Sequence, residues 1–396
     1  MSTKKIKRMR ALMTLTALIS AGSVQAQGVG DTFQVHGFMS QALILTDHND
    51  FFGPSSDSGG SWEYTELGLN ASVRPMRDVL VAGQVLSRKA GNYGDGWQPK
   101  LDYGIVDYQF VADESRALGI QVGRFKNPFG FYNQTRDAPS TRPGILLPQS
   151  IYFDRSRSLG LASDGVTVYD EERFSNGTLY LQGGIGLPQV NSDAEISLSS
   201  SNPNLEGRLS TIGQVMYSHA GGKLNLGVSV AEVRADYQSR QETNVDGTFI
   251  FQPTILSLQY NAEKWSLTAE YEFQRKRLKD FHRAGYNSTA DGESWYLQYQ
   301  YRFSKQWQWL VRYDYTVSDR NDRDGSHYAK SGAGYDYSRF AKDVTTGIQW
   351  SITPAWRAQA ELHHVNGTGW LPRQDNKEDE TEQYWNMLMI QTSFSF

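Results

Sequence analysis

The sequence predicts an all-β protein: a transmembrane antiparallel β-barrel of about 16 strands, with a long third loop folded into its pore. Three observations support this prediction. Apolar and polar residues alternate in segment after segment, short and long connections alternate between these segments, and aromatic residues recur beside the short connections. After residue 26 no apolar run approaches the roughly 18 to 20 residues that a membrane-spanning helix needs.

The first 26 residues have the features of a secretory signal peptide. A basic segment that ends at Arg10 precedes an apolar stretch that ends at Ile19, and a small-residue cleavage site follows at Ala26. We therefore expect a signal peptide over residues 1–26 and an exported barrel over residues 27–396. The chain has no cysteine for a disulfide or a thiolate metal site, and its 39 basic and 43 acidic residues give no sign of nucleic-acid binding.

Sixteen segments show the two-residue period of a strand with one apolar and one polar face. Between residues 295 and 303, for example, every odd-numbered residue is apolar or aromatic. A soluble sheet would alternate in the same way, so the number and spacing of the segments decide the interpretation. The expected strands are 33–46, 61–73, 78–88, 100–112, 116–125, 163–170, 177–186, 207–219, 223–235, 253–261, 265–275, 294–303, 307–318, 341–351, 355–366 and 384–396.

The connections between the segments distinguish the two ends of the expected barrel. Those after even-numbered strands are short, such as 113–115 and 304–306, whereas those after odd-numbered strands run from about 11 residues to nearly 40. Outer-membrane barrels have short periplasmic turns and long external loops. Aromatic pairs flank the short turns, as Phe303 and Trp307 do, which is typical of a girdle at the membrane interface. The alternative is the aromatic core of a soluble β-sandwich.

The last expected strand places Phe394 and Phe396 on one apolar face together with Ile390. This ending resembles the assembly signal that the barrel-assembly machinery reads in outer-membrane proteins. We therefore expect Phe394 and Phe396 to act as that signal, and we expect a location in the outer membrane of a Gram-negative bacterium, in contact with its lipid and lipopolysaccharide.

Residues 118–169 resemble the phosphate-selective porin O and P family. The resemblance rests on Gly-Arg-Phe-Lys at 123–126, on Pro-Phe-Gly at 128–130 and on Tyr-Phe-Asp-Arg-Ser-Arg-Ser at 152–158. It implies a homotrimer of sixteen-stranded barrels, each with a loop folded into its pore. The phosphate-selective members have a lysine-rich fifth loop, whereas residues 236–252 contain only one basic residue. The resemblance therefore gives no reason to expect phosphate selectivity in this chain.

The third long loop, about residues 126–162, is expected to form the pore constriction. Its five basic and two acidic residues give a formal charge of 5 minus 2, or +3. Clusters of arginine and lysine in a pore favour anions. The alternative is an external loop whose arginines bind lipopolysaccharide phosphates. The candidate constriction residues are Lys126, Arg136, Arg142, Arg155 and Arg157.

Strand parity also predicts which charged side chains face the lumen. On the strand at 265–275, Ala269 should face lipid and Glu270 should face the lumen, where we expect an arginine in its place to be tolerated. These side chains either contact permeant ions or are solvated wall residues paired with neighbours. The candidate lumen-wall residues are Glu270, Glu272, Arg302, Arg312, Asp314, Arg357 and Glu361.

The sequence offers no enzymatic motif, no cofactor motif and no metal site. No Gly-x-Ser-x-Gly segment occurs, and we expect no catalytic pairing for His363 or His364. The expected function is passive diffusion of small hydrophilic solutes through a water-filled channel with a weak preference for small anions. Two alternatives are a channel specific for organic anions or sugars, and a non-conducting barrel that acts as an adhesin or structural anchor.

Overall fold

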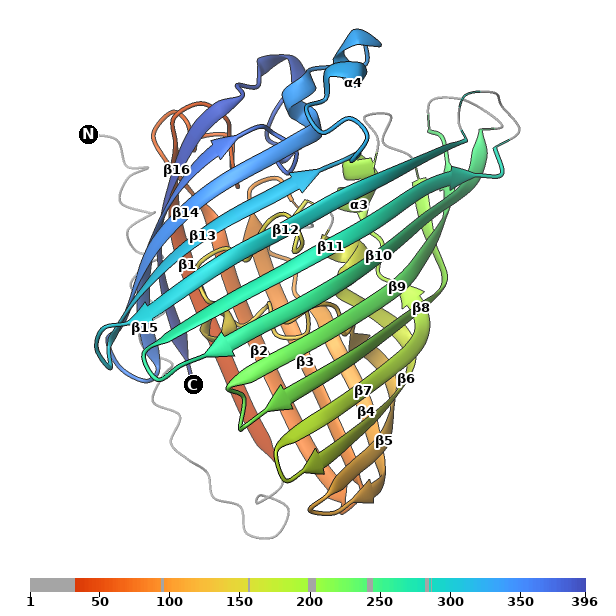
Figure 1. Cartoon of the computed structure of the whole chain (residues 1–396), viewed down its shortest axis with the longest axis vertical. Coiled ribbons are helices and arrows are strands. Elements are labelled where there is room, and N and C mark those ends of the chain that lie inside the picture. The colour runs from red at the N-terminus through yellow and green to blue at the C-terminus, as the bar shows by residue number, and fades with distance from the viewer. Residues whose placement is uncertain are drawn as a thin grey trace, which may run out of the picture. The chain divides into compact units, whose positions relative to one another are not determined.

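The protein was analysed as a computed structural model that describes residues 33–93, 96–155, 157–198, 204–240, 245–281, 285 and 287–396. The expected signal peptide lies outside the described residues. Within them, sixteen strands form a closed antiparallel barrel, which confirms the predicted fold (Figure 1). The strands are β1 Gln34–Thr46, β2 Ser61–Met76, β3 Val79–Ala90, β4 Lys100–Ala112, β5 Arg116–Lys126, β6 Ala162–Phe174, β7 Gly177–Pro188, β8 Asn204–His219, β9 Leu224–Gln238, β10 Asp246–Asn261, β11 Trp265–Lys279, β12 Ser288–Arg302, β13 Trp307–Val317, β14 Phe340–Ser351, β15 Trp356–Asn366 and β16 Tyr384–Ser395.

Each strand pairs with its neighbours in sequence, and β1 pairs with β16 to close the barrel. The closing seam includes two backbone hydrogen bonds between Gly37 and Phe396, each 3.0 Å long, in which each residue donates to the carbonyl of the other. The Phe396 ring lies so near Gly37 that a Cβ at this glycine would approach the ring to 2.5 Å. A larger residue at position 37 would therefore displace the ring.

Buried and exposed side chains alternate along the strands. The buried ones are mostly polar and the exposed ones mostly apolar, which is the reverse of a soluble protein. On β11 the inward-facing Thr268, Glu270 and Glu272 are buried, whereas the outward-facing Tyr271 is exposed. Exposed large apolar side chains recur on the outward face of other strands, as Leu256 does on β10. The outer surface is therefore apolar and the interior polar, as in a barrel that crosses a membrane. None of the described helices is long and apolar enough to span a bilayer.

Several strands extend further than predicted on the side of the long connections. β10 begins at Asp246 instead of residue 253, and β12 begins at Ser288 instead of residue 294. Residues 288–293 of β12 are mostly polar on both faces, and residues 249–251 of β10 are three consecutive apolar residues, so neither extension shows the hydrophobic alternation that predicts a strand. Cross-strand ion pairs are found instead, as between Arg275 and Asp291, whose Nε and Oδ1 atoms are 2.7 Å apart.

The long connections contain short helices and lie at one rim of the barrel. We use loop 3 for residues 127–161, loop 7 for 318–339 and loop 8 for 367–383. Turns of two to four residues join the strands at the other rim. The helices with a full description are η2 Pro139–Thr141, α2 Arg157–Leu161, α3 Ser192–Leu198, α4 Ser326–Lys330, η3 Asp336–Arg339 and η4 Glu378–Glu380.

Candidate functional site

Loop 3 lies inside the barrel and touches inward-facing side chains on strands far apart in the sequence (Figure 1). Its segments bind carboxylates on β2, β11, β13 and β15. A loop fixed in this way across a polar lumen narrows the passage between the two rims. It is therefore the first candidate for a functional site.

Glu270 on β11 holds the first arm of loop 3. Its carboxylate accepts hydrogen bonds from the Tyr152 hydroxyl at 2.5 Å and from the Phe131 amide at 2.9 Å, both in loop 3. It also accepts from the hydroxyls of Tyr296 and Ser257 on neighbouring strands, at 2.8 and 2.5 Å. Burial and the adjacent Glu270 raise the pKa of Tyr152 well above its usual value, which keeps the hydroxyl a donor. An arginine at position 270 would leave these four donors without their acceptor, so this geometry predicts that the substitution impairs the docking of loop 3.

Glu361 on β15 holds the tip of loop 3. Its two carboxylate oxygens accept from the backbone amides of Ile145 at 2.7 Å and Leu146 at 3.2 Å. Arg312 on β13 donates to the Leu146 carbonyl at 3.1 Å. Asp314 on the same strand accepts from a third loop amide, that of Ser150, at 3.3 Å. Backbone groups of the loop are thus satisfied by charged groups of the wall.

Glu66 on β2 is a partner of loop 3 that the sequence did not reveal. It forms an ion pair with Arg142 of the loop and a second one with Arg88 of β3, whose Nε lies 3.3 Å from the carboxylate. Arg142 also donates to the Tyr64 hydroxyl at 2.7 Å. Burial alone would lower the pKa of Arg142, but the adjacent Glu66 and Tyr64 raise it overall. Strand parity is the signal that could have placed Glu66 on the inward face of β2, whereas its pairing with Arg142 depends on the path of the loop.

Three further basic residues of the predicted constriction lie beside acidic groups in a similar way. Lys126, the last residue of β5, forms ion pairs with Asp102 and Asp137, and Arg157 pairs with Asp137. Arg136 donates to the Tyr152 carbonyl at 2.9 Å and lies 3.7 Å from Asp154. Four of the five candidate constriction residues therefore have an acidic partner, and the loop does not present its formal charge of +3 as open cationic sites.

Arg155 lies at a cavity together with five other basic side chains, of which Arg136 and Arg157 lie beside the aspartates named above. We call Arg155, Lys276, Arg339 and Arg373 the cationic cluster. They come from loop 3, β11, η3 and loop 8. Burial and the neighbouring Arg373 and Arg339 lower the pKa of Arg155 to about 10, so the guanidinium is charged at neutral pH. Among the described residues, Lys276, Arg339 and Arg373 form no ion pair with a carboxylate.

The other lumen-wall candidates occupy different positions. Glu272 is buried at the same cavity, next to Lys276. Arg302 lies at the short-turn rim and donates to the carbonyls of Ala262 and Glu263, at 3.0 and 3.2 Å. Arg357 donates to the Ser140 carbonyl of loop 3 at 3.1 Å. All seven wall candidates thus lie on the inward face of the barrel or at its short-turn rim. They do not form a single site.

His363 is the second feature that the sequence did not reveal. Its ring nitrogens lie 2.8 Å from Asp343 and 3.4 Å from Glu361, an arrangement that the sequence did not predict. Parity places these three side chains on one face, but their proximity depends on the register of β14 and β15. No group of three or more His, Asp or Glu able to hold a metal ion occurs in the part of the chain that the structure describes.

Comparison with solved structures identifies porins with the same fold. The anion-selective porin from Comamonas acidovorans aligns with a TM-score of 0.58 at 10% identity, over 92% of this chain and 99% of that chain. The outer membrane channel DcaP of Acinetobacter baumannii gives 0.56 at 12% identity, over 92% and 97%. The trimer form of OmpT, an outer membrane protein of Vibrio cholerae, gives 0.58 at 10% identity, over 92% and 99%. No family model matches the chain. No curated protein matches it either.

Proposed function

We propose that the chain is an outer-membrane porin of a Gram-negative bacterium that lets small hydrophilic solutes diffuse passively through its lumen. The observation that carries this proposal is the inward-folded loop 3, fixed to β2, β11, β13 and β15 inside a barrel with an apolar outer surface. A loop fastened at several points across the lumen narrows a passage, whereas an anchor or adhesin would place its long loops outside. The porin folds of the compared structures agree with this function.

A weak preference for anions is part of the proposal, and the geometry supports a different origin from the one expected. Four of the five loop residues predicted to attract anions are held in pairs with acidic groups. The cationic cluster contributes Arg155 and three further basic groups around a single buried carboxylate, Glu272. A low-dielectric wall focuses the field of such a cluster and raises the local concentration of anions.

Homotrimeric assembly and recognition by the barrel-assembly machinery also belong to the proposal. The likeness of residues 118–169 to the phosphate-selective porin O and P family supports a trimer, as does the trimer form of one compared structure. The hydrogen bonds of Phe396 at the closing seam fit a role of Phe394 and Phe396 in assembly.

Conductance of the purified protein in a planar lipid bilayer tests the function. Ohmic single-channel steps, with a reversal potential in a potassium chloride gradient that indicates weak anion preference, are the expected result. The preference should fade at high salt, because the Debye length falls to about 3 Å at 1 M. A barrel that inserts without conducting would refute the porin and favour an anchor, and saturation of the current by one solute would favour a specific channel.

A further inference from the structure

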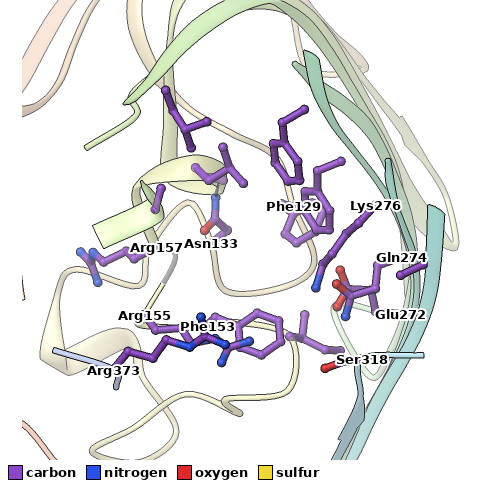
Figure 2. Close-up of a pocket in the computed structure, with 18 of the residues that line it drawn as sticks. Phe129, Asn133, Phe153, Arg155, Arg157, Glu272, Gln274, Lys276, Ser318 and Arg373 are labelled. Carbon is purple, nitrogen blue, oxygen red and sulfur yellow. Dashed lines mark hydrogen bonds between the residues drawn. The ribbon is translucent and has the colours of Figure 1, made fainter. Parts of the chain in front are cut away.

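The cavity beside the cationic cluster combines charge with an apolar wall. It has a volume of about 250 Å³ and lies between loop 3, β10 and β11 and the loops at the long-loop rim. Figure 2 shows Arg155, Arg373 and Phe153 on one side of it, with Lys276, Glu272 and Gln274 opposite. Its apolar wall consists of Phe129, Ile151, Phe153, Leu159, Leu205, Phe249 and Phe251.

Buried polar atoms without partners also point to a ligand. Glu272 and Gln274 are each only 1% exposed. Within the described residues, Oε2 of Glu272 and Oε1 of Gln274 have no hydrogen-bond partner. Figure 2 shows both side chains at the cavity, with Lys276 extending toward them. Buried polar atoms without partners cost free energy, and both atoms are acceptors, so this site can accept hydrogen bonds from N–H or O–H groups of a ligand.

The chemistry of the wall selects the class of ligand. Four basic side chains around one carboxylate favour an anion, and guanidinium groups bind carboxylates with two parallel hydrogen bonds. Phenylalanine side chains of loop 3 and β10 favour an apolar or aromatic body over a small hydrated ion. The cavity is slightly smaller than the usual range for drug-sized ligands, which indicates a compact molecule.

We propose that this cavity is a binding site for single-ring aromatic carboxylates, with the carboxylate at the cationic cluster and the ring against Phe153 and Phe251. The site lies on the long-loop side of the points where Glu270 and Glu361 hold loop 3, so a solute from that side meets it before the narrowest part of the lumen. The inference rests on the proposed function only for the route by which the ligand arrives.

Equilibrium dialysis of radiolabelled benzoate against the folded, detergent-solubilised protein tests the site without requiring conduction. Saturable binding is expected, with weak competition by acetate, which lacks the ring, and by benzamide, which lacks the charge. Competition by inorganic phosphate as strong as that by unlabelled benzoate would overturn the proposal, because the apolar wall would then contribute nothing. Binding that does not saturate would overturn it as well.

The variants Arg373→Gln and Lys276→Gln should each weaken benzoate binding about tenfold, since each removes one charged donor. Arg373→Lys should retain most of the affinity. Lys377→Gln is the matched control, because Lys377 lies in the same loop but pairs with Glu380 at the exposed surface, at 2.7 Å. Folding of each variant is checked by heat-modifiable migration in gels, and two neutralising variants that both fold and bind like the native protein would refute the site.

Conductance measurements on the same preparations separate the two proposals. Benzoate binding by a protein that does not conduct would refute the porin and leave the site intact. Conduction without benzoate binding would refute the site and leave the porin intact.

Discussion

The basic residues that fasten loop 3 to wall carboxylates and those of the cationic cluster have the same chemistry but different surroundings. Arg142 is buried between Glu66 and Tyr64, and Lys126 is buried between two aspartates. Arg155 instead shares a cavity with Arg339 and Arg373. The comparison teaches that formal charge along a loop says little about the charge that a solute meets. A cation paired with a wall carboxylate fastens the loop, and a cation clustered with other cations attracts anions.

Removing an acidic partner of a fastened cation should have the largest effect. Glu66→Ala leaves Arg142 buried without a carboxylate partner and leaves Arg88 with Asp154 alone, and breaking a buried pair in this way costs about 3–5 kcal/mol. Urea unfolding in lipid vesicles measures the loss. Glu63→Ala on the same strand is the control, because the pair of Glu63 with Lys89 is solvent-accessible and should contribute about 0–1 kcal/mol. Equal losses would mean that Glu66 does not fasten the loop.

The two faces of β11 give the next comparison. Ala269→Arg places a charge on the apolar outer surface, at a cost of roughly 2–4 kcal/mol near the bilayer midplane. Glu270→Arg should also impair folding or widen the channel, because four donors lose their acceptor. Yield of folded protein and single-channel conductance are the measurements. A Glu270→Arg protein with native yield and native conductance would show that loop 3 is not docked on β11.

Weakening the attachment of the loop tip should have a smaller effect. In Glu361→Gln the side chain can accept with its carbonyl oxygen only, so the Ile145 or Leu146 amide loses its partner. An unsatisfied buried donor costs about 1–3 kcal/mol. We expect more open-channel noise in bilayer recordings, with little change in mean conductance. Glu263→Gln, in an exposed turn, should leave the noise unchanged.

The smallest expected effect is on ion preference. Arg373→Glu reverses one charge of the cationic cluster, so the reversal potential in a potassium chloride gradient should move toward cations by a few millivolts at low salt, on the order expected for one focused charge. Lys377→Glu, at the exposed part of loop 8, should shift it less. If the two variants shift the reversal potential equally, the cluster does not control the anion preference.

The sequence predicted the barrel well because hydrophobic alternation reports directly on burial in a two-sided strand. It failed at the starts of β10 and β12, because polar residues occupy both faces of the β12 extension and consecutive apolar residues interrupt the alternation in the β10 extension. Parity placed Glu270 and Glu361 inside, and loop composition identified Arg142 and Arg155 as candidates. The partners of the loop residues could not be predicted, because pairs such as Arg142 with Glu66 depend on the path of the loop across the lumen and not on any local sequence pattern.

The attachment of loop 3 has a consequence for the order of folding. Its anchors are distant in the chain: Arg142 binds a residue 76 positions earlier, and Ile145 binds one 216 positions later. Loop closure over such distances carries an entropic cost that the barrel must offset first. The tip of loop 3 can bind Glu361 only once β15 has joined the sheet, so this attachment is expected to form late in the assembly of the barrel.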